Sequence, residues 1–312
     1  MFRTFFFLGM VNLLIVLTLS FFLRLLGIDS SMHQAGMNLN TLAIYCLVWG
    51  MGGSFISLMI SKWMAKSMMG VKIIDPGKSS GMESYYYLVK MVHQLAKKAG
   101  LKEMPEVGIY ESDDINAFAT GPSKNNSLVA VSTGLLRRMS QDEIEGVLGH
   151  EVAHIANGDM VTMTLLQGVM NAFVMFAARI VTMVIDNALR NNSDDEESSS
   201  GGLGYFSRFM VITVLEIAFG LLANILVAWF SRYREFRADK GGSLLASKPK
   251  MIAALSALER NFEQMTSAQE NQDEGMVRAF KISSKDGWFA LFSTHPPLKA
   301  RIEALKNAKG AY

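Results

Sequence analysis

The chain has 312 residues, of which 50% are hydrophobic and 19% are charged, and its mean hydropathy is positive. This composition is too apolar for an ordinary soluble domain and too charged for a helical bundle that lies wholly in lipid. A net charge of +2 gives no indication of nucleic-acid binding, and the single cysteine, Cys46, excludes both a disulfide framework and a cysteine-rich zinc site.

Four apolar stretches are long enough to cross a bilayer, which takes about 20 residues. In chain order they are residues 4–23, a stretch within 38–61, residues 160–178 and residues 209–230. The first resembles a signal peptide in position only, since its core is too long and no cleavage site follows, so we expect it to be retained. The last contains Glu216, for which a protonated or hydrogen-bonded helix contact is favoured over a place in an intramembrane cavity. The polar residues that could bond to it are Gln167, Asn171 and Asn224.

Basic residues predict how these segments are oriented. Four lysines follow the second segment, and three arginines and a lysine follow the fourth. By the positive-inside rule, both ends of the chain and the region between the second and third segments face the cytoplasm. The acidic linker at 193–197 fits an outside location but does not indicate one. The predicted division is a first transmembrane hairpin, a cytoplasmic part, a second hairpin and a second cytoplasmic part, over residues 1–61, 62–159, 160–230 and 231–312.

Between the second and third segments the chain has the patterns of a small globular region. Residues 83–99 have the amphipathic spacing of a helix closed by Gly100. Three short β-like runs follow, EVGIY, INAFATG and SLVAVST, and they predict a small meander of consecutive strands. Ser140 and Glu143 form an S-x-x-E capping box, which predicts a helix that begins at about residue 141.

This predicted helix carries two histidines and a glutamate with the spacing of a metal site. His150 and His154 are four residues apart, so both imidazoles lie on one helix face and can bind the same Zn²⁺. Glu151 stands beside that face, where it can take a proton from a metal-bound water. The alternative is an ordinary helix with two hydrogen-bonded histidines and a solvated glutamate, and the motif alone does not decide between them.

A catalytic zinc requires a third protein ligand and an open position for water. The stretch SRYREFRADK, which follows the fourth apolar segment, contains Glu235 and Asp239 four residues apart. One carboxylate can bind the metal while the other orients a ligating histidine, although a surface helix with arginine–carboxylate pairs has the same pattern. Two segments separate His154 from this stretch, so both halves of the site return to one side of the membrane. A continuous helix from His154 to Met160 would be about 9 Å long, which predicts a zinc close to the cytoplasmic membrane surface.

Four stretches together resemble the HtpX-type membrane zinc endopeptidases, which are relatives of the prenyl-protein endopeptidases. They are INAFATG, HEVAHIANGD, SRYREFRAD and STHPPLKARI, and the resemblance covers nearly the whole chain. It implies one Zn²⁺ per chain, with ligands His150, His154 and Glu235. It also implies that Glu151 is the catalytic base and that Asp239 hydrogen bonds to a ligating histidine.

The resemblance further implies where a substrate binds. Asn116, Ala117 and Phe118 resemble a strand beside the cleft, to which an extended peptide adds by β-pairing, and an ordinary buried strand end is the alternative. His295 and Arg301 resemble a pair near the active site that steadies the oxyanion or the substrate carbonyl. A proline-initiated helix with a capping role explains this pair about as well.

These patterns predict a mainly α fold with four transmembrane helices in two hairpins and a cytoplasmic α+β zincin-like metalloprotease domain that includes the small β-meander. The predicted activity is zinc-dependent hydrolysis of peptide bonds in misfolded or damaged membrane and cytoplasm-exposed proteins. The resemblance implies that this activity serves protein quality control under stress at the bacterial inner membrane. Polypeptides and membrane lipid are the expected partners, nucleic acid is not, and the sequence does not indicate an oligomeric state.

The alternatives have less support in the sequence. A prenyl-protein endopeptidase would usually carry more membrane segments, and a site-2-type intramembrane protease would have its H-E-x-x-H inside an apolar run. A non-catalytic zinc-containing chaperone or scaffold would close its coordination with a fourth protein ligand, and no nearby cysteine or histidine in the sequence offers one. A transporter function is supported only by Glu216 and by the number of apolar segments.

Overall fold

The computed structural model of the chain describes residues 39–77, 83–191, 202–270 and 294–308, which are mainly helical. The first predicted transmembrane segment and the acidic linker lie outside the described residues. The helices are α3 (Leu39–Met68), the short 3-10 helix η1 (Glu83–Tyr85), α4 (Tyr86–Lys98), α5 (Thr133–Arg138), α6 (Gln141–Asn157), α7 (Asp159–Asn191), α8 (Tyr205–Leu245), α9 (Lys248–Glu270) and α11 (Leu298–Asn307). The strands are β1 (Lys72–Ile73), β2 (Glu106–Tyr110), β3 (Ala117–Ser123) and β4 (Asn126–Ser132).

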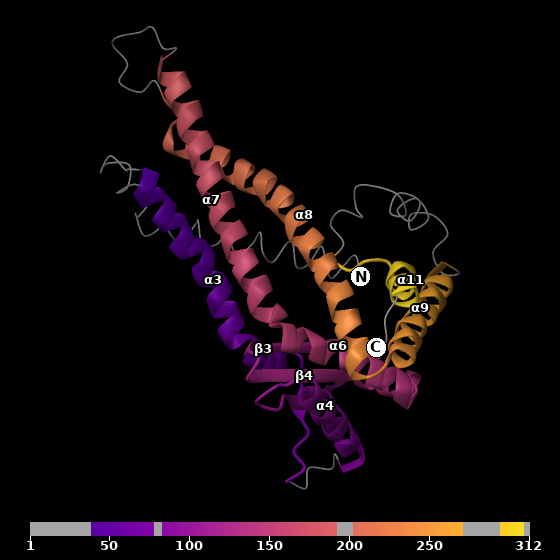
Figure 1. Cartoon of the computed structure of the whole chain (residues 1–312). Helices are drawn as coiled ribbons and strands as arrows, with labels where there is room; N and C mark the ends of the chain where they lie inside the picture. The colour runs from indigo at the N-terminus through magenta and orange to yellow at the C-terminus, as the bar shows by residue number, and fades with distance from the viewer. Residues whose placement is uncertain (1–38, 78–82, 192–201, 271–293, 309–312) are drawn as a thin grey trace. The chain divides into compact units, whose positions relative to one another are not determined.

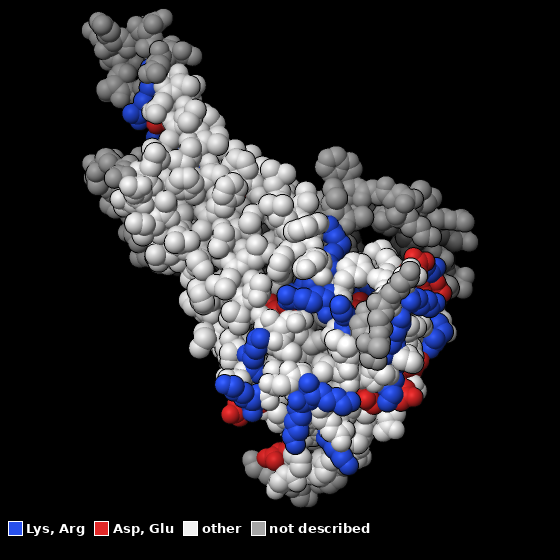
Figure 2. Space-filling model, in the orientation of Figure 1, with Lys and Arg blue, Asp and Glu red and all other residues white. Residues whose placement is uncertain are grey.

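The described residues fall into two compact units. Of the described residues, the first contains those within 39–56 and 164–228, and the second contains those within 57–163 and 229–308. Among the described residues, α3, α7 and α8 are long and apolar enough to cross a membrane, and they contain the second, third and fourth predicted segments. On the face shown in Figure 2, the helices of the first unit carry few charged side chains, whereas charged side chains cover much of the second unit.

In the first unit, the carboxylate of Glu216, in the fourth predicted segment, accepts a hydrogen bond from a neighbouring helix. Glu216 on α8 is 1% exposed and accepts a hydrogen bond from Arg179 Nη1 on α7 at 3.0 Å. The same nitrogen of Arg179 donates to the carbonyl of Met175 at 3.0 Å. Two of the predicted partners, Gln167 and Asn171, hydrogen bond to each other instead. The hydrogen-bonded helix contact is confirmed, but its partner is Arg179. This residue was not considered because it lies one position beyond the predicted third segment.

The sheet of the second unit has the strand order β1-β2-β4-β3. β2 and β4 are parallel, and the two outer pairs are antiparallel, so the predicted meander is wrong although its three strands exist. The reason is burial: residues 127–132 of β4 are all buried, which favours a central place in the sheet. β3 is only partly buried and contains Pro122, which has no N–H to donate to a sheet ladder and is tolerated at an edge.

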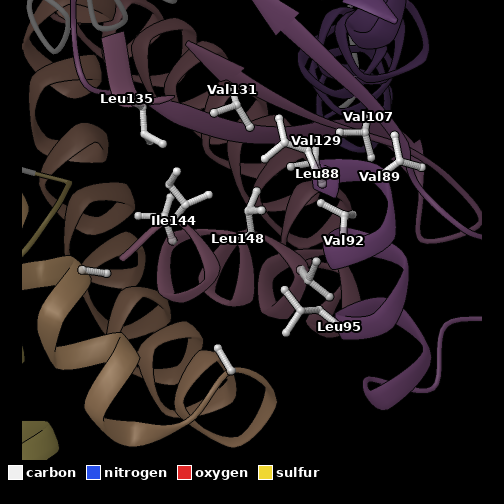
Figure 3. Packing of buried hydrophobic residues seen from close by; sticks show 14 of the residues in the cluster. Leu88, Val89, Val92, Leu95, Val107, Val129, Val131, Leu135, Ile144 and Leu148 are labelled. Atoms are coloured by element: carbon white, nitrogen blue, oxygen red, sulfur yellow. The ribbon is translucent and has the colours of Figure 1, made fainter. Parts of the chain in front are cut away.

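The core of the second unit lies between this sheet and two helices. In Figure 3, Leu88 and Val92 of α4 and Leu148 of α6 point toward Val129 and Val131 of β4. All five side chains are buried. The amphipathic spacing predicted for residues 83–99 is therefore the apolar face that α4 packs against the sheet.

Helix boundaries follow the predicted signals, with one exception. α4 is followed by Gly100 with a φ of 73°, and the capping box is formed, since Ser140 Oγ accepts from the Glu143 N–H and the Glu143 carboxylate accepts from the Ser140 N–H. α6, however, ends at Gly158, whose φ of 72° is left-handed, and α7 begins at Asp159. The two are separate helices, so the estimate of 9 Å along one continuous helix does not hold.

Helix α9 packs against α6, and α11 packs against α9. Helices α9 and α11 lie side by side (Figure 1), with Ile302 and Leu305 of α11 in one buried cluster with Met251 of α9. α6 packs closely on α9 because Gly146 has no side chain: a Cβ there would lie 2.4 Å from the carbonyl oxygen of Lys250. This packing places α6, α8 and α11 around the residues that the sequence analysis singled out.

Candidate metal centre

Helices α6 and α8 bring the three predicted zinc ligands together. His150 and His154 lie on one face of α6, and their Nε2 atoms are 3.0 Å apart. The carboxylate of Glu235 on α8 lies 3.5 Å from the first of these atoms and 3.4 Å from the second. One ligand atom from each residue lies within 4.8 Å of the other two, and all three side chains are buried.

The second ring nitrogen of each histidine contacts an aspartate. His150 Nδ1 is 2.9 Å from Asp239 Oδ1, and His154 Nδ1 is 2.6 Å from Asp159 Oδ2. A carboxylate oxygen accepts the hydrogen bond, so Nδ1 carries the proton and, in a neutral ring, Nε2 presents a lone pair. Among the described residues, Glu235 Oε1 is buried and has no hydrogen-bond partner. Two nitrogens and one carboxylate that converge in this way fit a zinc ion.

In the absence of metal, the same surroundings favour a proton. Burial alone would lower the pKa of His150, but its hydrogen bonds with Asp239 and Glu235 outweigh burial and raise the pKa to about 9. A metal cation that binds Nε2 takes the place of that proton. The centre is therefore electrostatically suited to a positive ion.

Arg301 and His295, which lie far from α6 and α8 in the sequence, contact the metal centre. Arg301 on α11 donates Nε and Nη2 to the two carboxylate oxygens of Asp239, at 2.7 and 2.6 Å. Both side chains of this ion pair are buried. His295 precedes α11, places its Nδ1 2.8 Å from Glu235 Oε2, and has a side chain that is 42% exposed. Arg301 also lies 3.4 Å from Glu235 Oε2 and 3.4 Å from His150 Nδ1, so both residues contact predicted ligands.

Glu151, the predicted base, follows the first histidine on α6 and is half-buried. Because Glu151 is one residue from His150 on the same helix, its side chain lies beside the face that carries the two histidines. Its charge also affects the site: burial would lower the pKa of Arg301, but the hydrogen bond and charge of Asp239 raise it, with Glu235 and Glu151 contributing further.

The predicted substrate strand lies at an edge of the sheet. Asn116 precedes β3, where its N–H donates to Ser132 Oγ at 3.1 Å. Ala117 and Phe118 begin β3 and pair with β4, and β3 also contacts α6. Because β3 is last in the strand order, its outer edge pairs with no further strand in the part of the chain that the structure describes.

One aspartate of the site was not predicted from the sequence. Asp159 is completely buried and is bonded to His154 on one side and to the guanidinium of Arg237 on the other. The signal was present in the sequence, since Gly158 can end a helix in the left-handed conformation and return the next residue toward the last turn. We expected instead that the helix continued into the third apolar segment.

Comparisons with known proteins agree with the resemblance. Residues 85–309 match the family model described as Peptidase family M48. Protease HtpX of Shewanella loihica is 50% identical over 295 residues, which cover 95% of this chain and 96% of that protein. Protease HtpX of Shewanella oneidensis is 49% identical over 302 residues, which cover 97% and 98%. Among solved structures, S. mikatae Ste24p has a similar fold, with a TM-score of 0.55 at 16% identity over 92% of this chain and 66% of that one.

Proposed function

Because the chain belongs to peptidase family M48 and is a membrane metalloprotease, we propose that His150, His154 and Glu235 hold one zinc ion and that Glu151 is the catalytic base of an endopeptidase. The observation that carries this proposal is the convergence of two Nε2 atoms on a carboxylate oxygen that has no hydrogen-bond partner in the described residues. A non-catalytic scaffold is not favoured, because a structural zinc site requires a fourth protein ligand, whereas the candidate group found among the described residues contains three.

The chemistry divides between the ion and the chain. A bound zinc ion would supply a Lewis acid that polarises the scissile carbonyl and acidifies the attacking water. Glu151 accepts the proton of that water and returns it to the amine nitrogen of the leaving peptide. Asp239 keeps Nδ1 of His150 protonated, so that Nε2 remains available as a ligand. His295, which is partly exposed, steadies the substrate carbonyl, and Arg301 lies beside it, since both contact the same oxygen of Glu235.

The substrate is an extended stretch of polypeptide that adds to the outer edge of β3, beside Asn116, Ala117 and Phe118. The position of β3 at the end of the sheet and its contact with α6, which carries the two histidines, support this arrangement. Backbone hydrogen bonds along an edge strand bind a peptide with little regard to its sequence. A strand-pairing site of this kind accepts unfolded chains and excludes folded ones.

The protease acts at the cytoplasmic face of the bacterial inner membrane, with transmembrane hairpins over residues 1–61 and 160–230 and the protease parts over 62–159 and 231–312. The basic residues after the second and fourth apolar segments and the three membrane-length helices support this topology. Its substrates are misfolded or damaged membrane and cytoplasm-exposed proteins, which makes quality control under stress its role.

A direct test compares the full-length protein with two variants, purified in detergent with a chelator and then supplied with zinc. Glu151→Gln removes the proposed base, and Glu145→Gln is a matched control on α6 whose carboxylate contacts Lys250 at 2.7 Å. We expect all three proteins to bind about one zinc, and only the wild type and the control to cleave casein. Cleavage by Glu151→Gln at the wild-type rate would show that the base is assigned wrongly.

A further inference from the structure

The two predicted zinc histidines have the same kind of surroundings on the side away from the metal. His150 contacts Asp239, and Asp239 is held by Arg301 through two hydrogen bonds. His154 contacts Asp159, and Asp159 is bonded to the guanidinium of an arginine on α8. The sequence predicted a role for the first of these aspartates only.

From this geometry we infer that Asp159 is a positioning residue for the zinc ligand His154 and that Arg237 holds Asp159 in place. The inference rests on the proposed zinc site. The 2.6 Å contact makes Nδ1 of His154 the protonated nitrogen, so that Nε2 points its lone pair toward His150 Nε2 and Glu235. Carboxylate partners of this kind fix the orientation of a ligating histidine and raise its basicity.

The position of Asp159 follows from the break between two helices. Gly158 ends α6 with a left-handed φ, and Asp159 is the first residue of α7, five residues after His154. Its carboxylate is completely buried, whereas Arg237 is 44% exposed, so the arginine reaches the aspartate from the surface of the second unit. A buried carboxylate is costly unless it is paired, and here both of its oxygens have partners.

A purely structural role at the beginning of α7 is the competing explanation, because an acidic residue in a first turn stabilises a helix. The test therefore needs a control that removes such a charge elsewhere. Asp142 lies in the first turn of α6, is exposed, and pairs with Lys250 at 3.0 Å. Asp142→Asn and Asp159→Asn make the same chemical change at two helix beginnings, and only the second affects a proposed ligand.

The experiment measures zinc affinity by competition with a chelator, the absorption spectrum of the Co²⁺-substituted protein, and the melting temperature of the metal-free protein, all on the full chain in detergent. For Asp159→Asn we expect zinc affinity to fall about 10- to 100-fold and the Co²⁺ bands to shift, because an amide does not fix the ring nitrogen that carries the proton. Asp142→Asn should leave both unchanged. Arg237→Gln, which keeps the aspartate, should give a smaller loss of affinity, and Arg237→Lys should restore part of it.

Wild-type zinc affinity and Co²⁺ spectrum in Asp159→Asn would overturn the inference, and so would an equal loss in Asp142→Asn. If Asp159→Asn does not fold, the Arg237 variants decide, since wild-type affinity in Arg237→Gln would then overturn it. Failure of the proposed function is distinguishable, because in that case the wild-type protein itself would bind no zinc.

Discussion

Both units bury charged side chains, but they balance them differently. In the first unit, Glu216 on α8 faces Arg179 on α7, and each charge meets its opposite. In the second unit, Asp239 and Asp159 are likewise each matched by an arginine. Glu235 also lies 3.4 Å from Arg301, yet it faces both histidines as well, and its Oε1 has no hydrogen-bond partner among the described residues.

The pair Arg179–Glu216 stabilises the packing of two helices, whereas the carboxylate and histidines of the second unit form a site that can bind an ion. A buried ion pair that is complete in itself needs nothing further and can in principle be replaced by apolar side chains of similar size. At the metal centre, the arginine–aspartate pairs cannot be exchanged so simply, because the aspartates also orient His150 and His154. Four substitution experiments can break or sharpen this contrast.

The largest effect is expected at Glu235, whose Oε1 has no hydrogen-bond partner among the described residues. Glu235→Ala removes one of three ligands, so zinc should be lost under conditions in which the wild type retains about one ion per chain. His295→Ala removes only a neighbour of that carboxylate and should lower zinc affinity far less. Metal analysis after dialysis against a weak chelator measures both. Equal zinc content in Glu235→Ala and wild type would contradict the ligand assignment.

Replacing whole ion pairs tests the contrast directly. Glu216→Leu alone leaves a buried arginine and should lower the free energy of unfolding by about 3–5 kcal/mol, whereas Arg179→Leu with Glu216→Leu should recover most of that loss. Asp239→Leu with Arg301→Met should also keep much of the stability but lower zinc affinity about 10- to 100-fold. Denaturant unfolding in detergent and chelator competition give the two quantities. If Arg179→Leu with Glu216→Leu also lost zinc, the ion pair of the first unit would not be separate from the metal centre in function.

The same glycine substitution should have opposite effects in the two units. Gly146→Ala in α6 would place a methyl group 2.4 Å from a backbone oxygen of α9. We expect this clash to lower the free energy of unfolding by about 1–3 kcal/mol. Gly52→Ala in α3 meets nothing within 4 Å and should be neutral or stabilising by up to about 1 kcal/mol. Thermal unfolding of both variants provides the comparison, and equal melting temperatures would show that the packing of α6 on α9 is looser than described.

The smallest effect is expected at the beginning of α6. Burial raises the pKa of Glu143, but hydrogen bonds from Ser140 and Arg260 outweigh it and lower the pKa below its ordinary 4.5. A carboxyl with a lowered folded-state pKa stabilises the protein above that ordinary value and loses its contribution as the pH falls through the folded-state pKa. Glu143→Gln should therefore cost about 1 kcal/mol at pH 7 and nothing in strong acid. A cost that does not change with pH would mean that the charge has no part in the cap.

The sequence predicted local features well and long-range ones partly. The capping box at Ser140, the amphipathic helix before Gly100 and the three apolar strands depend on neighbouring residues, and all are found. The predicted meander was wrong because the strand that is buried on both faces, β4, takes a central place in the sheet whatever its order in the chain. The spacing of His150 and His154 predicted a pair of metal ligands, whereas the resemblance to a known family was needed to choose Glu235 over Asp239 as the third.

Other contacts at the site gave weaker signals. Asp159 reaches His154 only because the chain turns at Gly158, and the apolar run that follows suggested a continuous helix. Arg179 lay one residue beyond the predicted segment, so it was not considered as a partner for Glu216. In both cases the information lay in backbone geometry and helix length, which composition and motif spacing do not fix.

The central claim is that two imidazoles and one carboxylate hold the metal. X-ray absorption at the zinc edge, measured on the full-length protein in detergent, tests it most directly. The account predicts about one zinc per chain, with two histidine nitrogens at about 2.0–2.1 Å, oxygen in the remaining positions and no sulfur. A sulfur ligand, fewer than two imidazoles, or a wild-type protein that retains no zinc would contradict it.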